Sequence, residues 1–226
     1  MGQYYTPIIL NGTGGKVIGS FSPYDYQNGM KLMEHSYIGN QLVDSVVAKA
    51  LYVSVSTGKT VTLAWVGDYA TLEEDIRTGY YTGQNRDYER IFNRAQRAAD
   101  NEVGRIPSDD EEIKRAFKNV NSVVFYNNIR KEKLSLKDYR KAQIANRLAN
   151  GLPPYRDDPE DFIIHPIPLL TALGNGKGGG DYFGSCMEWI GKWALHPLWI
   201  VPEGVPDPEG EWTDISNQIL FEENRG

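Results

Sequence analysis

The chain changes character twice along its length, and this alternation limits the folds that are open to it. Short apolar runs rich in Tyr, Ile, Val and Trp, which are typical of β-strands, occur near both ends of the chain. The middle, residues 71–150, is polar and begins with a helix-start pattern, Thr71-Leu72-Glu73-Glu74. The sequence therefore predicts an α+β fold in one domain, residues 1–226: a mixed or antiparallel sheet built from both chain ends, with residues 71–150 as a helical insertion.

Turn and cap residues place the expected elements. Asn11-Gly12 predicts the turn of a hairpin, Asn28 is expected to cap a helix over residues 29–52, and Gly151 is expected to end the last helix of the insertion. The other elements are expected as strands over residues 3–10, 16–21, 61–66 and 162–173, one or two strands over residues 188–201, three or four helices over residues 71–150, and a strand or short helix over residues 212–223.

Composition is that of a soluble globular protein, with 40% hydrophobic and 24% charged residues. The sequence has no run of about 18 apolar residues that could span a bilayer, and its start lacks the basic and apolar regions of a secretory signal. The one cysteine, Cys186, excludes an internal disulfide and favours a reducing compartment. We therefore expect a cytoplasmic protein with no membrane partner, in which Cys186 is a buried apolar residue rather than a nucleophile.

The net charge of −6 is distributed unevenly. Residues 71–156 carry 17 basic and 13 acidic side chains, whereas the rest of the chain carries 7 and 17. Four arginines, at positions 86, 90, 94 and 97, fall on one side of a predicted helix, but acidic residues close by favour an ordinary solvated face over a phosphate-binding one. An acidic body with a mildly basic middle does not favour generic nucleic-acid binding.

Residues 174–182, Gly-Asn-Gly-Lys-Gly-Gly-Gly-Asp-Tyr, contain five glycines within seven positions. Ordered glycine loses more backbone entropy than any other residue, so such a loop is typical of a place that needs positive φ or close approach to the main chain. The glycines match G-x-G-x-x-G, but residues 181–199 are too rich in Gly and aromatics to open the helix of a dinucleotide site. An anion-binding backbone nest is one interpretation, formed by Gly174, Gly176, Lys177, Gly178, Gly179 and Asp181. A flexible hairpin without a ligand is the other.

The tripeptide Gly-Asp-Tyr occurs twice, at residues 67–69 and 180–182, each time shortly after a predicted strand. If the two strands are neighbours, the carboxylates of Asp68 and Asp181 could converge to bind a cation or to share acid–base work. The alternative is that each carboxylate accepts backbone hydrogen bonds within its own turn.

The three histidines, His35, His165 and His196, lack the spacing of a zinc site, so no metal is predicted. His35 and His165 are candidate catalytic residues together with Asp68 and Asp181, because a catalytic histidine needs a partner that orients it. The alternative for each histidine is a core or boundary position with satisfied hydrogen bonds.

Four segments of this sequence resemble an uncharacterised bacterial or bacteriophage protein family: MGQYY at residues 1–5, LMEHSYIGN at 32–40, WVGDYA at 65–70 and GNGKGGGDYFG at 174–184. The resemblance covers the β-rich ends and not the helical middle. It implies no activity and no cofactor.

Two functions follow as expectations. The first is a small-ligand site for a phosphorylated or nucleotide-like anion at the glycine-rich loop. The second is a non-catalytic interaction protein, such as a phage-encoded inhibitor of a host or defence complex. A closed pocket with converging polar groups would favour the first, and a flat exposed patch the second.

Overall fold

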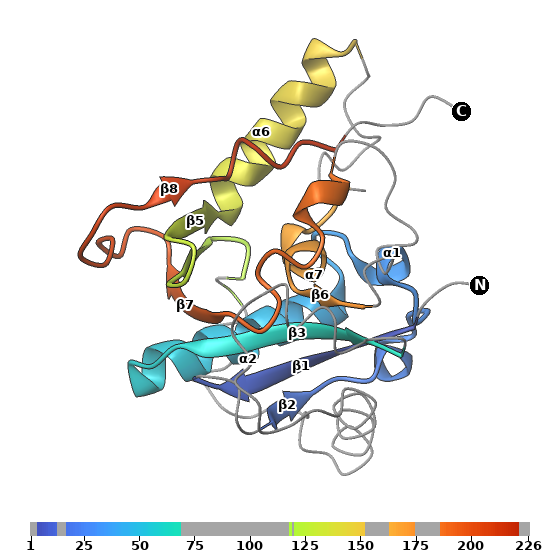
Figure 1. The fold of residues 1–226 in the computed structure, drawn as a ribbon. Coiled ribbons are helices and arrows are strands. Elements are labelled where there is room, and N and C mark those ends of the chain that lie inside the picture. Colours follow the sequence, from blue (N-terminus) through green and yellow to red (C-terminus); the bar gives the residue numbers. More distant parts are fainter. Residues whose placement is uncertain are drawn as a thin grey trace.

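Strands from both ends of the chain meet in one sheet in the computed structural model, which describes residues 4–12, 17–68, 118, 120–151, 163–174 and 186–221 (Figure 1). The strands are β1 (Tyr5–Asn11), β2 (Val17–Ser20), β3 (Val61–Gly67), β4 (Val123–Asn127), β5 (Glu132–Ser135), β6 (Ala172–Leu173), β7 (Pro197–Pro202) and β8 (Thr213–Asp214). The helices are α1 (Leu32–His35), α2 (Gln41–Thr57), α6 (Leu136–Ala149) and α7 (Pro166–Leu170), with 3-10 turns η1 (Pro23–Tyr26) and η2 (Met187–Trp189).

The sheet is mixed. Its order is β2-β1-β3-β7-β4-β5-β8, and most neighbours are antiparallel. The short strands β6 and β8 pair in parallel, with β3 and β5 respectively. One edge of β3 is shared, because β7 pairs with its first residues and β6 with Trp65 and Val66. The predicted α+β fold with a sheet from both chain ends is therefore confirmed.

Helix α2 covers one face of the sheet (Figure 1). Alternate side chains of β3 point to this face, so Leu63 and Trp65 pack with the apolar side of the helix, including Val46 and Leu51. All four are buried, and each such side chain stabilises the fold by about 1.5–3 kcal/mol relative to exposure. The main core lies between α2 and the sheet.

The other face of the sheet carries two smaller apolar clusters. One places Ala64 and Val66 of β3 against Leu195 from the segment before β7. The second centres on Tyr126 of β4, whose ring contacts Trp212 edge-on at 5.0 Å between ring centroids. The sheet is therefore covered on both faces by described residues, which explains why β3 is buried along its whole length.

The predicted helix over residues 29–52 is wrong in its start. Two helices occupy this region, and α2 begins after Asn40, whose side-chain oxygen accepts from the backbone N–H groups of Leu42 and Val43. Gly39 adopts a φ of 84°, which a glycine tolerates and which interrupts the helical path. Asn28 instead exchanges amide hydrogen bonds with Asn40.

The strand predicted over residues 162–173 is also corrected. Residues 166–170 form α7, and the sheet gains only Ala172 and Leu173. Proline suits the first helical position because its missing N–H would have no partner there, and Pro166 lies at that end of α7.

Within the predicted insertion, helix α6 is present, but residues 123–135 form the hairpin β4–β5 and belong to the sheet. The run Val123-Val124-Phe125-Tyr126 has the β-branched and aromatic residues typical of strands. Residues 71–117, with the arginine series at 86–97, lie outside the described residues.

Candidate functional site

The glycine-rich loop leaves the sheet at the carboxyl end of two neighbouring parallel strands. Strands β3 and β6 pair in register, with Val66 opposite Leu173. Asp68 and Gly174 follow these strands directly, so both lie at the same edge of the sheet. The carboxyl end of parallel strands is where open α/β sheets bind their ligands. For Asp68 and Asp181 to converge, the strands before them must be neighbours. Strands β3, before Asp68, and β6, before the glycine-rich loop, are neighbours.

Asp68 is held by the first described residue of the chain. Its carboxylate oxygen Oδ1 accepts from the backbone N–H of Tyr4 at 3.0 Å, and its own N–H donates to the Tyr4 carbonyl at 2.9 Å. These bonds extend the β1–β3 ladder by one residue beyond the pair Tyr5–Gly67. This carboxylate oxygen thus joins the end of β3 to the residue before β1, and this hydrogen bond does not lie within the turn of Asp68, where the alternative interpretation had placed it.

His35 is fully buried, and both of its ring nitrogens are used. Nδ1 lies 3.1 Å from the Gly29 carbonyl, and Nε2 lies 3.1 Å from the indole Nε1 of Trp65. The indole N–H can only donate, so Nε2 accepts and Nδ1 carries the proton. Burial lowers the pKa of His35 to about 4, more than its bond to Gly29 and the nearby Glu34 raise it. His35 is therefore a neutral ring that links the loop after η1 to β3.

His165 caps α7. Its Nδ1 accepts from the backbone N–H of Ile167 at 3.2 Å, and its own backbone N–H donates to the carbonyl of Ser36. Burial and, to a smaller extent, the positive charge of the nearby Arg140 lower the pKa of His165 to about 3. Ser36 follows His35 in the chain, so this backbone bond joins the segments that carry the two candidate catalytic histidines. Each of the two rings makes structural hydrogen bonds.

The remaining residues proposed for the loop, Gly176, Lys177, Gly178, Gly179 and Asp181, lie outside the described residues. Gly174 is described and is buried at the end of β6. Cys186, where the described chain resumes, is also buried, and its thiol donates to the Leu220 carbonyl.

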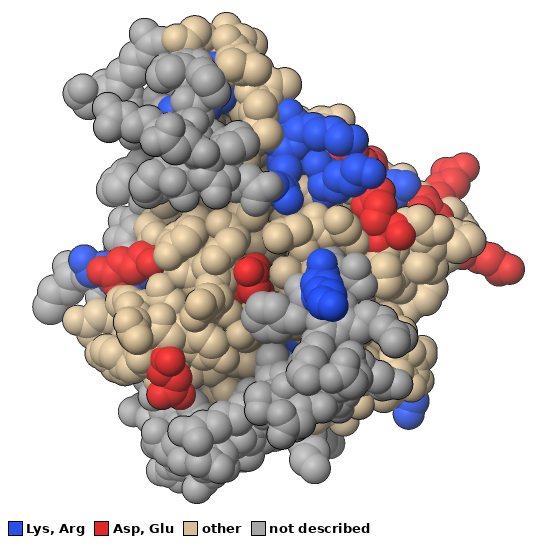
Figure 2. Space-filling view, turned by 180° about the vertical axis from the view of Figure 1, so that it is seen from behind, with Lys and Arg blue, Asp and Glu red and all other residues tan. Residues whose placement is uncertain are grey.

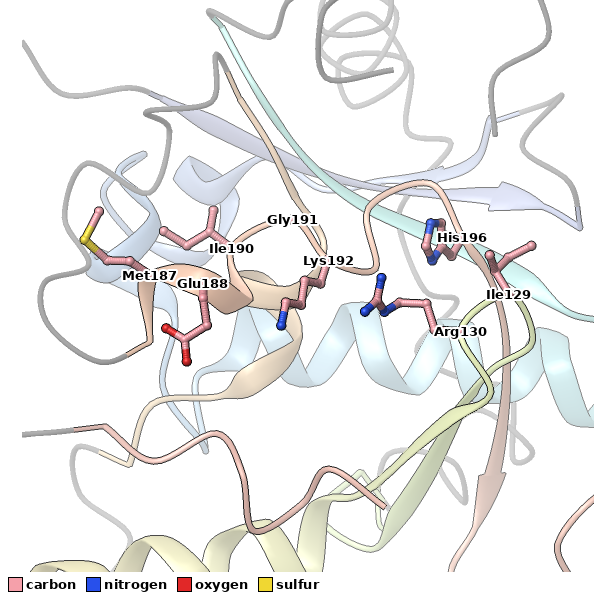
Figure 3. Close-up of a pocket in the computed structure, with 8 residues that line it drawn as sticks. All are labelled: Ile129, Arg130, Met187, Glu188, Ile190, Gly191, Lys192 and His196. Atoms are coloured by element: carbon pink, nitrogen blue, oxygen red, sulfur yellow. The ribbon is translucent and has the colours of Figure 1, made fainter. Parts of the chain in front are cut away.

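A cavity of about 610 Å³ opens where the chain returns from the loop (Figure 3). Its size lies within the range of small-molecule sites. The described residues that line it come from the β4–β5 turn and from the segment before β7: Ile129, Arg130, Met187, Glu188, Ile190, Gly191, Lys192 and His196. The pairing of β4 with β7, which places Asn127 opposite Leu198, brings these two segments together.

Asn127 and Glu132 fix the position of Arg130 at this cavity. The side-chain oxygen of Asn127 accepts from the backbone N–H groups of Ile129 and Arg130 and so shapes the turn. Glu132 accepts from the Arg130 Nε at 2.9 Å and from the indole N–H of Trp193 at 2.6 Å. The guanidinium is therefore held by Nε, and Figure 3 shows it extending toward the side chain of Lys192.

Lys192 lies on an aromatic face. Its ammonium is 3.9 Å from the ring centroid of Trp189, a cation–π contact. The neighbouring Gly191 has a φ of 70°, and a side chain there would meet the Ala172 carbonyl at 2.7 Å. Ala172 belongs to β6, two residues before the glycine-rich loop begins. The wall of the cavity is thus packed against the strand from which the loop departs.

His196 is oriented by Asn127. The Asn127 oxygen already accepts two backbone bonds, so its amide nitrogen must be the group that lies 3.0 Å from His196 Nδ1. Nδ1 therefore accepts, and the proton of the neutral ring is on Nε2. Burial lowers the pKa of His196 to about 4, assisted by the positive charge of Arg130. Leu195 before it has a φ of 61°, a strained value of the kind that clusters at ligand sites.

Sequence reasoning missed Arg130 and Lys192 because neither belongs to a local motif. One signal was available: Asn127-Asn128 follows a β-type run and precedes a second apolar position at Leu134, a pattern typical of a hairpin turn. The pairing of that hairpin with β7 is a long-range contact that no local pattern indicates.

The surface elsewhere has ordinary charge pairing. In Figure 2 the basic side chains gather over α6 with acidic side chains beside them, and Lys141 there pairs with Asp138 at 2.9 Å. Within the described ranges, no group of three or more His, Cys, Asp or Glu could hold a metal ion. The helices of the same ranges also lack the length and apolar character needed to cross a bilayer.

Comparison with known proteins gives no relative: no family profile, no curated protein and no solved structure matches this chain. The functional argument therefore rests on the site alone.

Proposed function

We propose that this protein binds a small phosphorylated or nucleotide-like anion at the glycine-rich loop and the cavity at its returning end. The observation that carries the proposal is the cavity of about 610 Å³ with two basic side chains, Arg130 and Lys192. The loop, residues 174–182, begins beside Asp68, and three residues separate its end from Cys186, so the cavity residue Met187 follows it closely in the sequence. A glycine loop supplies backbone N–H groups to an anion, and Lys177 adds a charge.

Both ends of the loop support this placement. Its start, at Gly174, follows β6 beside Asp68 at the end of β3. After it the described chain resumes at Cys186, directly before the cavity residue Met187, and the cavity residue Gly191 packs on the strand that precedes the loop. The proposal concerns binding in a reducing, cytoplasmic setting, and it assigns no reaction.

The test is calorimetry of the wild type and two loop variants with adenosine monophosphate and inorganic phosphate. Gly179→Val should abolish binding because a side chain blocks approach to the backbone. Lys177→Ala should weaken binding, and the loss should shrink at high salt because exposed charges are screened.

Denaturant unfolding of the same variants decides what a negative result means. If Gly179→Val unfolds the protein, the glycines serve a tight turn and the loop is not a ligand site. If Gly179→Val changes neither binding nor stability, the loop is not used, and a non-catalytic interaction protein becomes the better proposal.

A further inference from the structure

The two basic side chains of the cavity belong to different segments of the chain and make different contacts. Arg130 comes from the β4–β5 turn, whereas Lys192 comes from the segment between η2 and β7. Figure 3 shows both side chains extending toward the same region of the cavity. Two converging cations on separate, fixed segments are typical of a site that holds one anionic group.

Arg130 keeps N–H donors of its guanidinium for a ligand. Its salt bridge with Glu132 uses Nε, on the side edge of the guanidinium, which leaves the end edge, with one N–H from each Nη, for another acceptor. The Arg130 side chain is 39% exposed, whereas that of Glu132 is 13% exposed and also bound by Trp193. Glu132 is therefore a largely covered carboxylate that holds Nε, and the Nη groups can donate to a planar or tetrahedral oxyanion.

Lys192 has its charge compensated only in part. Trp189 offers the face of its ring, and among the described residues no carboxylate lies within salt-bridge distance of the Lys192 ammonium. An anion entering the cavity would thus supply a counter-ion that the described chain does not provide.

The rest of the lining selects against highly charged ligands. Ile129 and Met187 are 42% and 57% exposed, although large apolar side chains are usually covered. Ile190 also lines the cavity. Glu188 contributes a negative charge that repels a second anionic group on the same ligand.

We propose that Arg130 and Lys192 bind the single oxyanion group, a phosphate or a carboxylate, of a small molecule whose body is apolar. The inference rests on the proposed function and specifies the ligand: it carries one oxyanion group on an apolar body and is not a polyphosphate. Glu132 and Asn127 are positioning residues, because they fix Arg130 and its turn without lining the cavity.

Calorimetry at low salt tests the inference with four probes: phenyl phosphate, benzoate, inorganic phosphate and adenosine triphosphate. Phenyl phosphate or benzoate should bind at least about tenfold more tightly than inorganic phosphate, because the apolar ring is buried against the aliphatic lining. Whichever of the two binds more tightly identifies the oxyanion. Glu188→Gln should improve binding of adenosine triphosphate more than binding of phenyl phosphate.

Variants of the two cations locate the site. Arg130→Met and Lys192→Met should each weaken binding of phenyl phosphate or benzoate by about tenfold or more, since a hydrogen bond to a charged group is lost. Arg130→Lys keeps a charge for Glu132 but removes the fork, so it should also lose affinity while remaining folded. Lys49→Met is the matched control, because Lys49 also lies over an aromatic ring, that of Tyr52 on α2, and should bind as the wild type does.

The outcomes separate this inference from the proposed function. If the wild type binds neither the four probes nor adenosine monophosphate, both proposals are overturned; if it binds adenosine monophosphate but neither phenyl phosphate nor benzoate, this inference alone is overturned. If the wild type binds and Gly179→Val loses affinity while Arg130→Met and Lys192→Met do not, the loop is the site and the cavity is not. If the cation variants lose affinity and Gly179→Val retains it, the cavity stands without the loop.

Discussion

At the scale of single residues, the buried histidines show how a predicted catalytic group can be a structural one. His35 connects Gly29 to Trp65 through both ring nitrogens, and these two bonds require the neutral ring. Protonation would replace the acceptor at Nε2 with a donor that faces the indole N–H of Trp65. Protonation of His35 in the folded protein therefore reduces the free energy of unfolding.

This arrangement predicts a loss of stability in mild acid. The pKa of His35 is 6.5 in the unfolded chain and about 4 in the folded protein, so between these values the unfolded chain binds the extra proton. Stability should fall as pH falls from about 6.5 to about 4, by up to roughly 3 kcal/mol for this residue. Urea unfolding at pH 7, 6 and 5 measures the fall, which should be smaller in His35→Gln. Equal pH dependence in the two proteins would contradict this role.

Asp44 provides a control of opposite sign. Burial raises the pKa of Asp44 from 3.8 to about 6, so between these values the folded protein binds the extra proton. The contribution of Asp44 to the free energy of unfolding therefore rises as pH falls, whereas the contribution of His35 falls. Asp44→Asn should make the loss of stability in acid steeper than in the wild type.

At the scale of elements, sequence patterns succeeded where one local rule decided the structure. The hairpin over residues 3–21 and the strand over residues 61–66 were predicted from apolar runs and a turn dipeptide. The single helix over residues 29–52 was wrong because Leu32 and Leu42 share a face in one long helix, and this periodicity does not reveal the break at Gly39. The five residues of α7 are too few to show a helical period at all.

The start of α2 gives a direct test of the corrected boundary. Asn40→Ala should reduce the free energy of unfolding by about 1–2 kcal/mol, because the N–H groups of Leu42 and Val43 lose their acceptor. Asn28→Ala is the matched control, since it removes the same amide pair but leaves the cap in place. Urea unfolding should therefore rank Asn40→Ala as the more destabilised variant, and the reverse order would restore Asn28 as the cap.

At the scale of the whole molecule, the fold joins chain ends that the sequence separates widely. The edge of β3 that β1 does not use is completed by β6 and β7, both from the last third of the chain. The candidate cavity also depends on a long-range strand pairing, because the pairing of β4 with β7 places Arg130 and Lys192 in the lining of one cavity. Local patterns predicted that both ends share a sheet, but not these pairings, and so they could not predict the cavity.

One buried hydrogen bond measures the coupling between the two chain ends. The Ser54 hydroxyl on α2 accepts from the backbone N–H of Ile200 on β7 at 3.0 Å, and both residues are fully buried. Ser54→Ala should destabilise the protein by about 1–3 kcal/mol, because the Ile200 N–H is left buried without this acceptor. Ser56→Ala, on the exposed side of the same helix, shares the change in helix propensity and should stay within about 0.5 kcal/mol of the wild type. Equal denaturation midpoints for the two variants would show that α2 and β7 are not coupled through this bond.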